Sequence, residues 1–170
     1  MEKSIDDLIL DLKDSDDFVR EEAIGSLELK GEEAVEPLIA ALDERDKNIK
    51  LGAIEVLKAI GDKRAIPALV KTLGDRNKLV RREASTALTT MGDEAIEPVL
   101  AELDSPKWRV RGAACWILGA LGAEEALPKL EELLNDESSF VQYGAKDAIN
   151  RLQNESVFYS FLIFFFFYLF

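Results

Sequence analysis

Histidine is absent from this chain of 170 residues, and cysteine occurs once. Histidine is the commonest metal ligand and the usual general base near neutral pH. Without it, and with one cysteine, the chain cannot build zinc sites of the Cys/His kind or activate a nucleophile through a Ser-His-Asp or Cys-His arrangement. P-loop, dinucleotide-binding and EF-hand motifs are also missing. We therefore expect no enzyme activity and no metal or cofactor site.

Basic residues are scarce relative to acidic ones, at 21 against 33, which gives a net charge of -12. A strongly acidic surface repels phosphate backbones and argues against nucleic acid as a partner. The lone Cys115 cannot form an internal disulfide and fits a reducing compartment. No signal peptide precedes the charged N-terminal residues. We expect a cytoplasmic protein.

An internal repeat of 30 or 31 residues runs through the chain. Each unit carries a β-branched residue, an alanine four positions later and a leucine or isoleucine four positions after that, and most units add a glycine and a proline. The rows are Val19, Ile49, Val80, Val110 and Val141; Ala23, Ala53, Ala84, Ala114 and Ala145; Leu27, Leu57, Leu88, Leu118 and Ile149; Gly31, Gly61, Gly92 and Gly122; and Pro37, Pro67, Pro98 and Pro128. A repeat this regular indicates a fold built from repeated structural units.

Each unit is predicted to form two helices. In the fourth unit, Val110, Ala114 and Leu118 make one apolar stripe of a first helix. The glycine supplies the left-handed residue that ends this helix. Proline is tolerated in an opening turn, so its row marks the start of the second helix. Residues 5–12 match a second helix without its first. One pair cannot bury its stripe alone, so the pairs must stack.

The pattern VRxxAxxxLxxxG…AxxPL resembles HEAT repeats, specifically the HEAT-like repeats of phycobilisome lyases, over about residues 4–153. The resemblance implies an all-α, right-handed solenoid of about five helix pairs, or about ten helices, in a domain of residues 1–153. Relatives mostly serve as protein-interaction scaffolds, and some work with bilin chromophores. Another relative, deoxyhypusine hydroxylase, is a di-iron enzyme that uses His-Glu motifs, and this activity does not carry over to a chain without histidine.

A row of basic residues invites two interpretations. Arg20, Lys50, Arg81 and Arg111 could form a binding stripe, or a ladder between neighbouring repeats paired with the loop residues Asp16, Asp46 and Asn77. We favour the ladder, because arginine suits charge-assisted hydrogen bonds to loop carboxylates. Gln142 interrupts the row, and Lys107 replaces the loop acid in the fourth repeat.

Both tryptophans lie in the fourth repeat, at positions that are small or polar in the other repeats. We expect Trp108 and Trp116 to face solvent, and tryptophan and arginine are enriched in binding hot spots. The candidate partner-binding residues are therefore Trp108, Arg109, Arg111, Trp116 and Tyr143, the last aligned with Gly112 on the next first helix. In the alternative interpretation, Trp116 lies flat over Gly112 and fills local space. Cys115 is expected to be an inert core residue.

Charge is zoned along the chain. Residues 1–46 carry a net charge of -11, residues 47–91 carry +6 and residues 92–137 carry -7. Neighbouring bands could attract one another through the stacked repeats, or they could orient a partner with complementary bands. Acidic pairs such as Glu32–Glu33 and Glu131–Glu132 are expected to be solvated helix faces.

Two kinds of function follow. The first is a non-catalytic scaffold for protein–protein interaction, with the fourth repeat and the middle basic band as contact surfaces. The second is a lyase-type or chaperone-like factor that presents a chromophore or prosthetic group to a client protein. A HEAT-like DNA glycosylase would need a basic concave face with aromatics; Trp108 and Trp116 with their arginines hint at one, but the acidity opposes it.

The last 17 residues, 154–170, form a hydrophobic tail, and the segment VFYSFLIFFFFYLF (157–170) has no charge. These 14 residues are fewer than the roughly 20 needed to cross a bilayer. Three interpretations stand: a short membrane-inserting tail, a degenerate last helix packed on the fifth repeat, or an aberrant reading frame, which the low complexity favours. Membrane association is expected through this segment alone.

Overall fold

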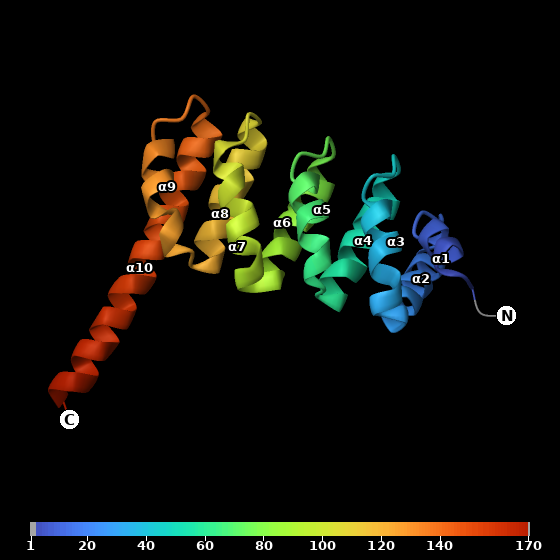
Figure 1. The fold of residues 1–170 in the computed structure, drawn as a ribbon, viewed down its shortest axis with the longest axis horizontal. Coiled ribbons are helices and arrows are strands. Elements are labelled where there is room, and N and C mark those ends of the chain that lie inside the picture. Colours follow the sequence, from blue (N-terminus) through green and yellow to red (C-terminus); the bar gives the residue numbers. More distant parts are fainter. Residues whose placement is uncertain (1–2, 170) are drawn as a thin grey trace. The chain divides into compact units, whose positions relative to one another are not determined.

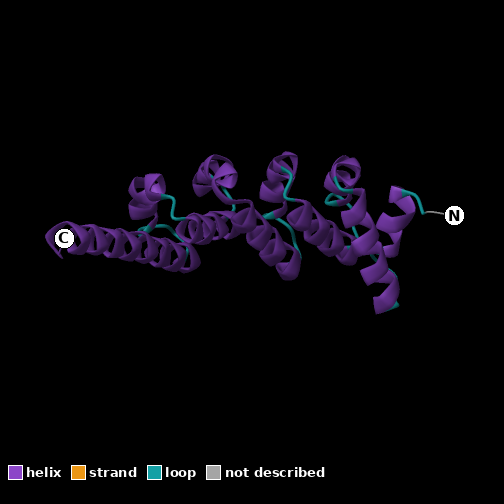
Figure 2. Cartoon of the chain, turned by 90° about the horizontal axis from the view of Figure 1, so that it is seen from below, coloured by secondary structure: helices purple, strands orange, loops and turns teal. Residues whose placement is uncertain are grey.

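The computed structural model of this protein describes residues 3–169 and the side chains of residues 3–154, and it consists of helices joined by short loops. Within that range there is no strand (Figure 2). The α-helices are α1 (Ile5–Asp11), α2 (Asp17–Lys30), α3 (Glu32–Ala41), α4 (Lys47–Ile60), α5 (Ile66–Thr72), α6 (Lys78–Met91), α7 (Ile96–Leu100), α8 (Trp108–Leu121), α9 (Leu127–Leu133) and α10 (Ser139–Leu169). Short 3-10 helices are η1 (Lys63–Ala65), η2 (Gly92–Ala95), η3 (Ala101–Asp104) and η4 (Glu124–Ala126).

The chain divides into two compact units, Met1–Pro98 and Val99–Phe170, and the boundary lies inside α7. In the first unit, the first helices α2, α4 and α6 alternate with the second helices α1, α3 and α5 (Figure 1). In the second unit, the first helices α8 and α10 flank the second helix α9. The expected all-α fold of HEAT-like helix pairs is confirmed, including α1 as a second helix without a first.

The alanine row behaves as expected, and the glycine row does so at two of its four positions. Gly31 and Gly92 have positive φ, but with ψ of -125° and -146° they lie outside the left-handed helical region. Gly61 and Gly122 end α4 and α8 in the left-handed region, at φ 71° and 70°. The residues of the alanine row are all buried, as are the leucines that follow them by one turn. A small side chain at this level lets neighbouring helices approach closely, so this row is the centre of the core.

The proline row differs from expectation in the first repeat. Pro67 and Pro128 lie in the opening turns of α5 and α9, after the 3-10 helices η1 and η4. Pro37 instead lies inside α3, because that helix begins directly after Gly31. Proline has no N–H group, so α3 lacks one intrahelical hydrogen bond at this point.

Two of the four residues of the basic row, Lys50 and Arg111, link neighbouring repeats as the ladder predicts, but their acidic partners are not the expected ones. Arg20 instead pairs with Asp17 on its own helix. Lys50 pairs with Asp75, and Arg111 makes two hydrogen bonds to Asp136, at 2.8 Å from Nε to Oδ2 and 2.9 Å from Nη2 to Oδ1. Both carboxylates belong to the loop before the following first helix. The expected partners Asp16, Asp46 and Asn77 cap first helices instead, since a short side chain there accepts hydrogen bonds from the opening N–H groups.

A second hydrogen bond links most of the row to the preceding loop. Each donor reaches the backbone carbonyl six residues before it. The pairs are Arg20 with Asp14, Arg81 with Asp75 (2.8 Å), Arg111 with Ser105 (2.8 Å) and Gln142 with Asp136 (2.6 Å). Gln142 therefore interrupts the charge of the row while keeping its backbone contact, because its amide NH₂ is also a donor.

Ala114→Leu should lower the free energy of unfolding by roughly 1–3 kcal/mol, because extra methylene groups overpack a filled core. Ala120→Leu is the matched control, since Ala120 is exposed on the same helix. Urea denaturation monitored by circular dichroism measures both. Equal midpoints for the two variants would contradict the assignment of Ala114 to the core.

Asp136→Asn should flatten the acid limb of the stability profile. Hydrogen bonds from Arg111 lower the pKa of the Asp136 carboxyl in the folded protein. A lowered folded pKa adds stability above the unfolded pKa of about 3.9, and this contribution is lost as the pH falls below it. Unfolding free energies measured by urea titration between about pH 5 and pH 3 should therefore fall less steeply in the variant. Identical slopes would contradict the proposed contribution of this pair.

Candidate functional site

Helices α8 and α10 approach each other closely because three positions between them are glycine. A Cβ atom on Gly119 would lie 2.7 Å from the Cα of Ala148. A Cβ atom on Gly144 would lie 3.4 Å from the Cβ of Cys115, and one on Gly112 would collide with the ring of Phe140. These contacts define the α8–α10 seam, and larger residues there would push the helices apart.

Aromatic rings cover the N-terminal end of this seam. Trp108 and Phe140 meet edge to face, with ring centroids 5.4 Å apart and an interplanar angle of 71°. The guanidinium carbon of Arg109 lies 4.2 Å from the centroid of the Trp108 ring. Edge-to-face pairs and cation–π contacts each contribute about 0.5–1.5 kcal/mol, so the three side chains hold one another in place.

Trp116 and Tyr143 extend the cluster along both helices. Trp116 follows Gly112 by one turn on α8, and Tyr143 directly precedes Gly144 on α10. At 100° per residue, both side chains fall beside the seam rather than in it. Trp108 is 38% exposed, Trp116 40% and Tyr143 74%. We call Trp108, Arg109, Trp116, Phe140 and Tyr143 the aromatic surface.

Arg111 does not belong to this exposed surface, which corrects the expectation for that residue. It is 8% exposed, and its guanidinium is occupied by Ser105, Asp136 and Glu137. These bonds join the loops before α8 and α10. Arg111 therefore holds the N-terminal ends of α8 and α10 in position.

Phe140 was missed in the sequence, although it occupies the position of Arg109 one repeat later. The three atoms nearest to a Cβ placed on Gly112 all belong to Phe140, so this ring lies against the glycine. The available signal was an aromatic residue one repeat after the Trp-Arg pair. The repeat rows alone did not show that this ring would cross the seam.

Cys115 is buried against Gly144, and burial raises the pKa of its thiol to about 12. The thiol stays protonated near neutral pH, so it is a weak nucleophile and a poor metal ligand. Its placement as a core residue is confirmed. In the part of the chain whose side chains are described, no three His, Cys, Asp or Glu residues gather closely enough to hold a metal ion.

The corresponding seam between α4 and α6 is open. A groove of about 300 Å³ follows it, with a charged rim. Its lining consists of Leu51, Ile54, Glu55, Lys58, Leu79, Arg82 and Glu83. Apart from Ile54, which aligns with Cys115, these residues stand at the positions that glycines and aromatic residues hold on α8 and α10. The second unit thus has a closed seam with aromatic flanks where the first unit has an open groove with a charged rim.

Ion pairs join the charge bands of the first unit. Lys71 of the basic band contacts Asp43, with a distance of 2.7 Å from Nζ to Oδ1. Arg64 contacts Glu32 and Lys63 contacts Glu94, each at 3.4 Å. Most of these side chains are exposed, so each pair contributes little to stability. The bands do attract one another between neighbouring repeats, as one of the two interpretations holds.

Within residues 3–154, whose side chains the structure describes, no helix is both long and apolar enough to cross a membrane. The backbone of α10 continues as helix to Leu169 (Figure 1). The side chains of the hydrophobic segment 157–170 lie outside those that the structure describes, so the three interpretations of this segment stay predictions.

The chain matches the family model of HEAT repeats over residues 5–89 and 66–150. No curated protein matches it. In the complex of CpcE and CpcF of phycocyanin lyase from Nostoc sp. PCC7120, one chain is 25% identical, with a TM-score of 0.57; the match covers 96% of this chain and 70% of that chain.

Two artificial proteins are also similar. An engineered protein is 23% identical with a TM-score of 0.49, and the match covers 88% of this chain and 79% of that chain. A designed armadillo repeat protein in complex with the peptide (KR)4 is 22% identical with a TM-score of 0.47, and the match covers 85% and 80%. The stacked helix pairs, the repeat rows and the family match over most of the chain lead to one conclusion: this protein belongs to the HEAT repeat family.

Proposed function

We propose that the protein is a non-catalytic scaffold that binds another protein through the aromatic surface on α8 and α10. The observation that carries this proposal is the exposure of Trp116 and Tyr143 beside a seam closed by glycine. Tryptophan, tyrosine and arginine are the residue types that most often dominate protein interfaces. Four of the five residues of the aromatic surface are of these types.

The support beneath this surface favours binding with little reorganisation. Arg111 links the loops before α8 and α10, and the Trp108 ring is fixed between Arg109 and Phe140. Side chains held in their bound positions lose little conformational entropy on association. A rigid, partly exposed aromatic surface therefore suits the recognition of a folded partner.

The chemistry of the described side chains supports a role without catalysis. The chain has no histidine, and its one thiol has a pKa raised to about 12. The paired carboxylates of the ladder, Asp75 and Asp136, are engaged by Lys50 and Arg111 and have lowered pKa values. These groups are held as charged structural partners and are poor candidates for proton transfer.

A second candidate is a lyase-type or chaperone-like factor that presents a chromophore or prosthetic group to a client protein. The similarity to a chain of the CpcE–CpcF phycocyanin lyase complex favours it. The ring of Trp116 could stack against a flat conjugated group. In this candidate the aromatic surface holds the group, whereas in the scaffold it contacts the partner directly.

Trp116→Ala should weaken partner binding by about 2 kcal/mol or more, as loss of a hot spot does, while the unfolding midpoint stays close to that of the parent. Leu134→Ala is the matched control, because Leu134 is 41% exposed in the same unit and outside the aromatic surface. Pull-downs with the full chain and both variants identify proteins whose recovery depends on Trp116. Titration of the purified partner then measures affinity. A large loss of stability with unchanged affinity would make Trp116 a packing residue.

Titration with a linear tetrapyrrole separates the two candidates. If the protein is a scaffold, adding the tetrapyrrole should leave the absorption spectrum of the pigment unchanged. The tryptophan fluorescence of the protein should fall by no more than the inner-filter effect. A saturable spectral change that disappears in Trp116→Ala and persists in Leu134→Ala would replace the scaffold with the chromophore-presenting factor.

A further inference from the structure

Each first helix has two flanks that meet its neighbours in the stack. We call the flank toward the preceding first helix the leading face, and the flank toward the following one the trailing face. At the α8–α10 seam three contacts define their register. On the trailing face of α8 and the leading face of α10, Gly112 meets Phe140, Cys115 meets Gly144, and Gly119 meets Ala148.

The leading face of α2 is uncovered. By the repeat spacing, Phe18, Glu22 and Ser26 occupy the positions of Phe140, Gly144 and Ala148. Phe18 is 71% exposed, Glu22 is exposed and Ser26 is half-buried. Where a first helix precedes them in their own unit, the residues equivalent to Ser26 are fully buried, namely Val56, Ala87 and Ala148. The leading face of α2 therefore has the form of a stacking surface without its neighbour.

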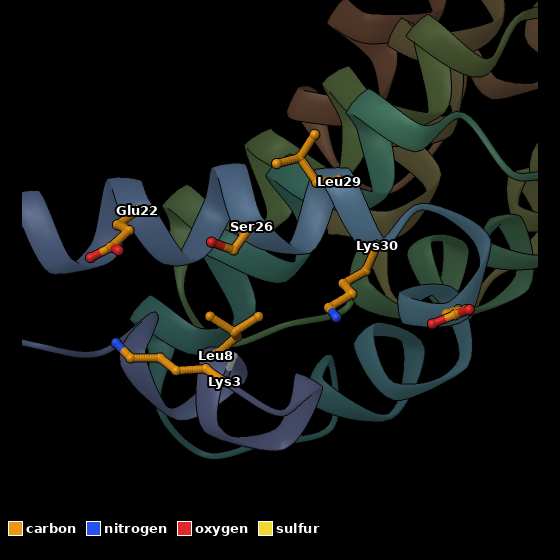
Figure 3. A pocket seen from close by; sticks show the side chains of 7 residues that line it. Lys3, Leu8, Glu22, Ser26, Leu29 and Lys30 are labelled. Atoms are coloured by element: carbon orange, nitrogen blue, oxygen red, sulfur yellow. The ribbon is translucent and has the colours of Figure 1, made fainter. Parts of the chain in front are cut away.

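An open groove of about 490 Å³ runs along this face (Figure 3). Glu22, Ser26 and Leu29 line it from α2, and Leu8 points into it from α1. Lys3 lies near Glu22 but donates its hydrogen bond to Asp11, at 2.8 Å. Lys30 and Glu33 complete the lining, so the groove contains both amino groups and carboxylates. The positions of α2 that would face a preceding first helix carry an aromatic ring, a carboxylate and a hydroxyl, at Phe18, Glu22 and Ser26. A helix with apolar, basic and polar positions would match them.

The trailing face of α10 has those positions. One repeat after Gly112, Cys115 and Gly119 stand Tyr143, Lys146 and Asn150, and all three are exposed. Among the side chains that the structure describes, none forms an ion pair with Lys146. This face carries an aromatic ring, a cation and an amide in successive turns of the helix.

We propose that the protein associates head to tail, with the trailing face of α10 in one copy packed on the leading face of α2 in the next. In the register of the α8–α10 seam, Tyr143 meets Phe18, Lys146 meets Glu22, and Asn150 meets Ser26. The three pairs are aromatic with aromatic, cation with carboxylate, and amide with hydroxyl. Each pair is complementary in its chemistry, which is the basis for choosing a second copy as the occupant.

The repeat order agrees with this arrangement. In the described chain, α1 is a second helix and α10 is a first helix. Stacking α10 of one copy before α2 of another therefore packs a first helix on a first helix, as in the α8–α10 seam. Contact between two like heads is disfavoured, because residues 1–46 carry a net charge of -11 in each copy. The interface is heterologous, so it can add further copies.

Sedimentation equilibrium of the full chain over a range of micromolar concentrations tests the proposal. The parent protein should associate reversibly. Lys146→Glu and Glu22→Lys should each weaken association by about tenfold, because each places like charges opposite one another. An equimolar mixture of the two variants should regain the association of the parent, since the new glutamate of one then meets the new lysine of the other.

Both substituted residues are exposed, and thermal unfolding of each variant verifies that it is folded. Tyr143 belongs to both the aromatic surface and this interface, whereas Trp116, Lys146 and Glu22 each belong to only one of them. Trp116→Ala should therefore associate like the parent, and the charge reversals test association without testing the proposed function. A parent that stays monomeric throughout overturns the proposal. Association that is indifferent to both charge reversals, as association through the hydrophobic tail would be, overturns it equally, and so does a mixture that associates no better than its components.

Discussion

The first helices α2, α4, α6 and α8 are each 14 residues long, a length at which an isolated helix is marginal in water. Their stability depends on burying the alanine row and the leucine row against neighbouring helices. Each of these helices is therefore stabilised chiefly by contacts with neighbouring helices. This dependence explains the small residues at the closest approaches.

Polar chemistry at the loops fixes the helices in the register that this packing requires. Asp46 and Asn77 cap helices, and Lys50 and Arg111 link α4 and α8 to the loop of the next repeat. In the second unit this support lies directly beneath the aromatic surface. The same interactions that order the repeats therefore also hold the candidate binding residues in place.

Much of the fold was predictable from the sequence because a repeat multiplies weak signals. A single buried alanine says little, whereas five at equal spacing identify a core row. The same alignment predicted that Trp108 and Trp116 face solvent, and both are about 40% exposed. Their remaining burial was not predictable, because a row gives the side of a helix but not the reach of neighbouring side chains.

Other features depended on contacts between different loops, which alignment within a repeat does not show. Asp16 and Asp46 precede residues of the basic row by four positions and were expected to pair with them. Their carboxylates instead cap the N-termini of α2 and α4. Asp136 lies 25 residues from Arg111 and reaches it through stacking. Phe140 crosses the seam for the same reason. The candidate site was therefore predictable in its location, while its buried support and one of its rings were not.

The hydrogen bond from the basic row to the preceding loop ends on a backbone carbonyl. A carbonyl is present whatever side chain the loop residue carries, and the loop residues that accept this bond include both aspartate and serine. The geometry of the helix–loop junction therefore does not depend on which side chain the accepting loop residue carries. Substitutions at Ser105 can alter charge and solubility without changing how α8 begins, so these loops are positions where the sequence can drift while the stacking of the helices is kept.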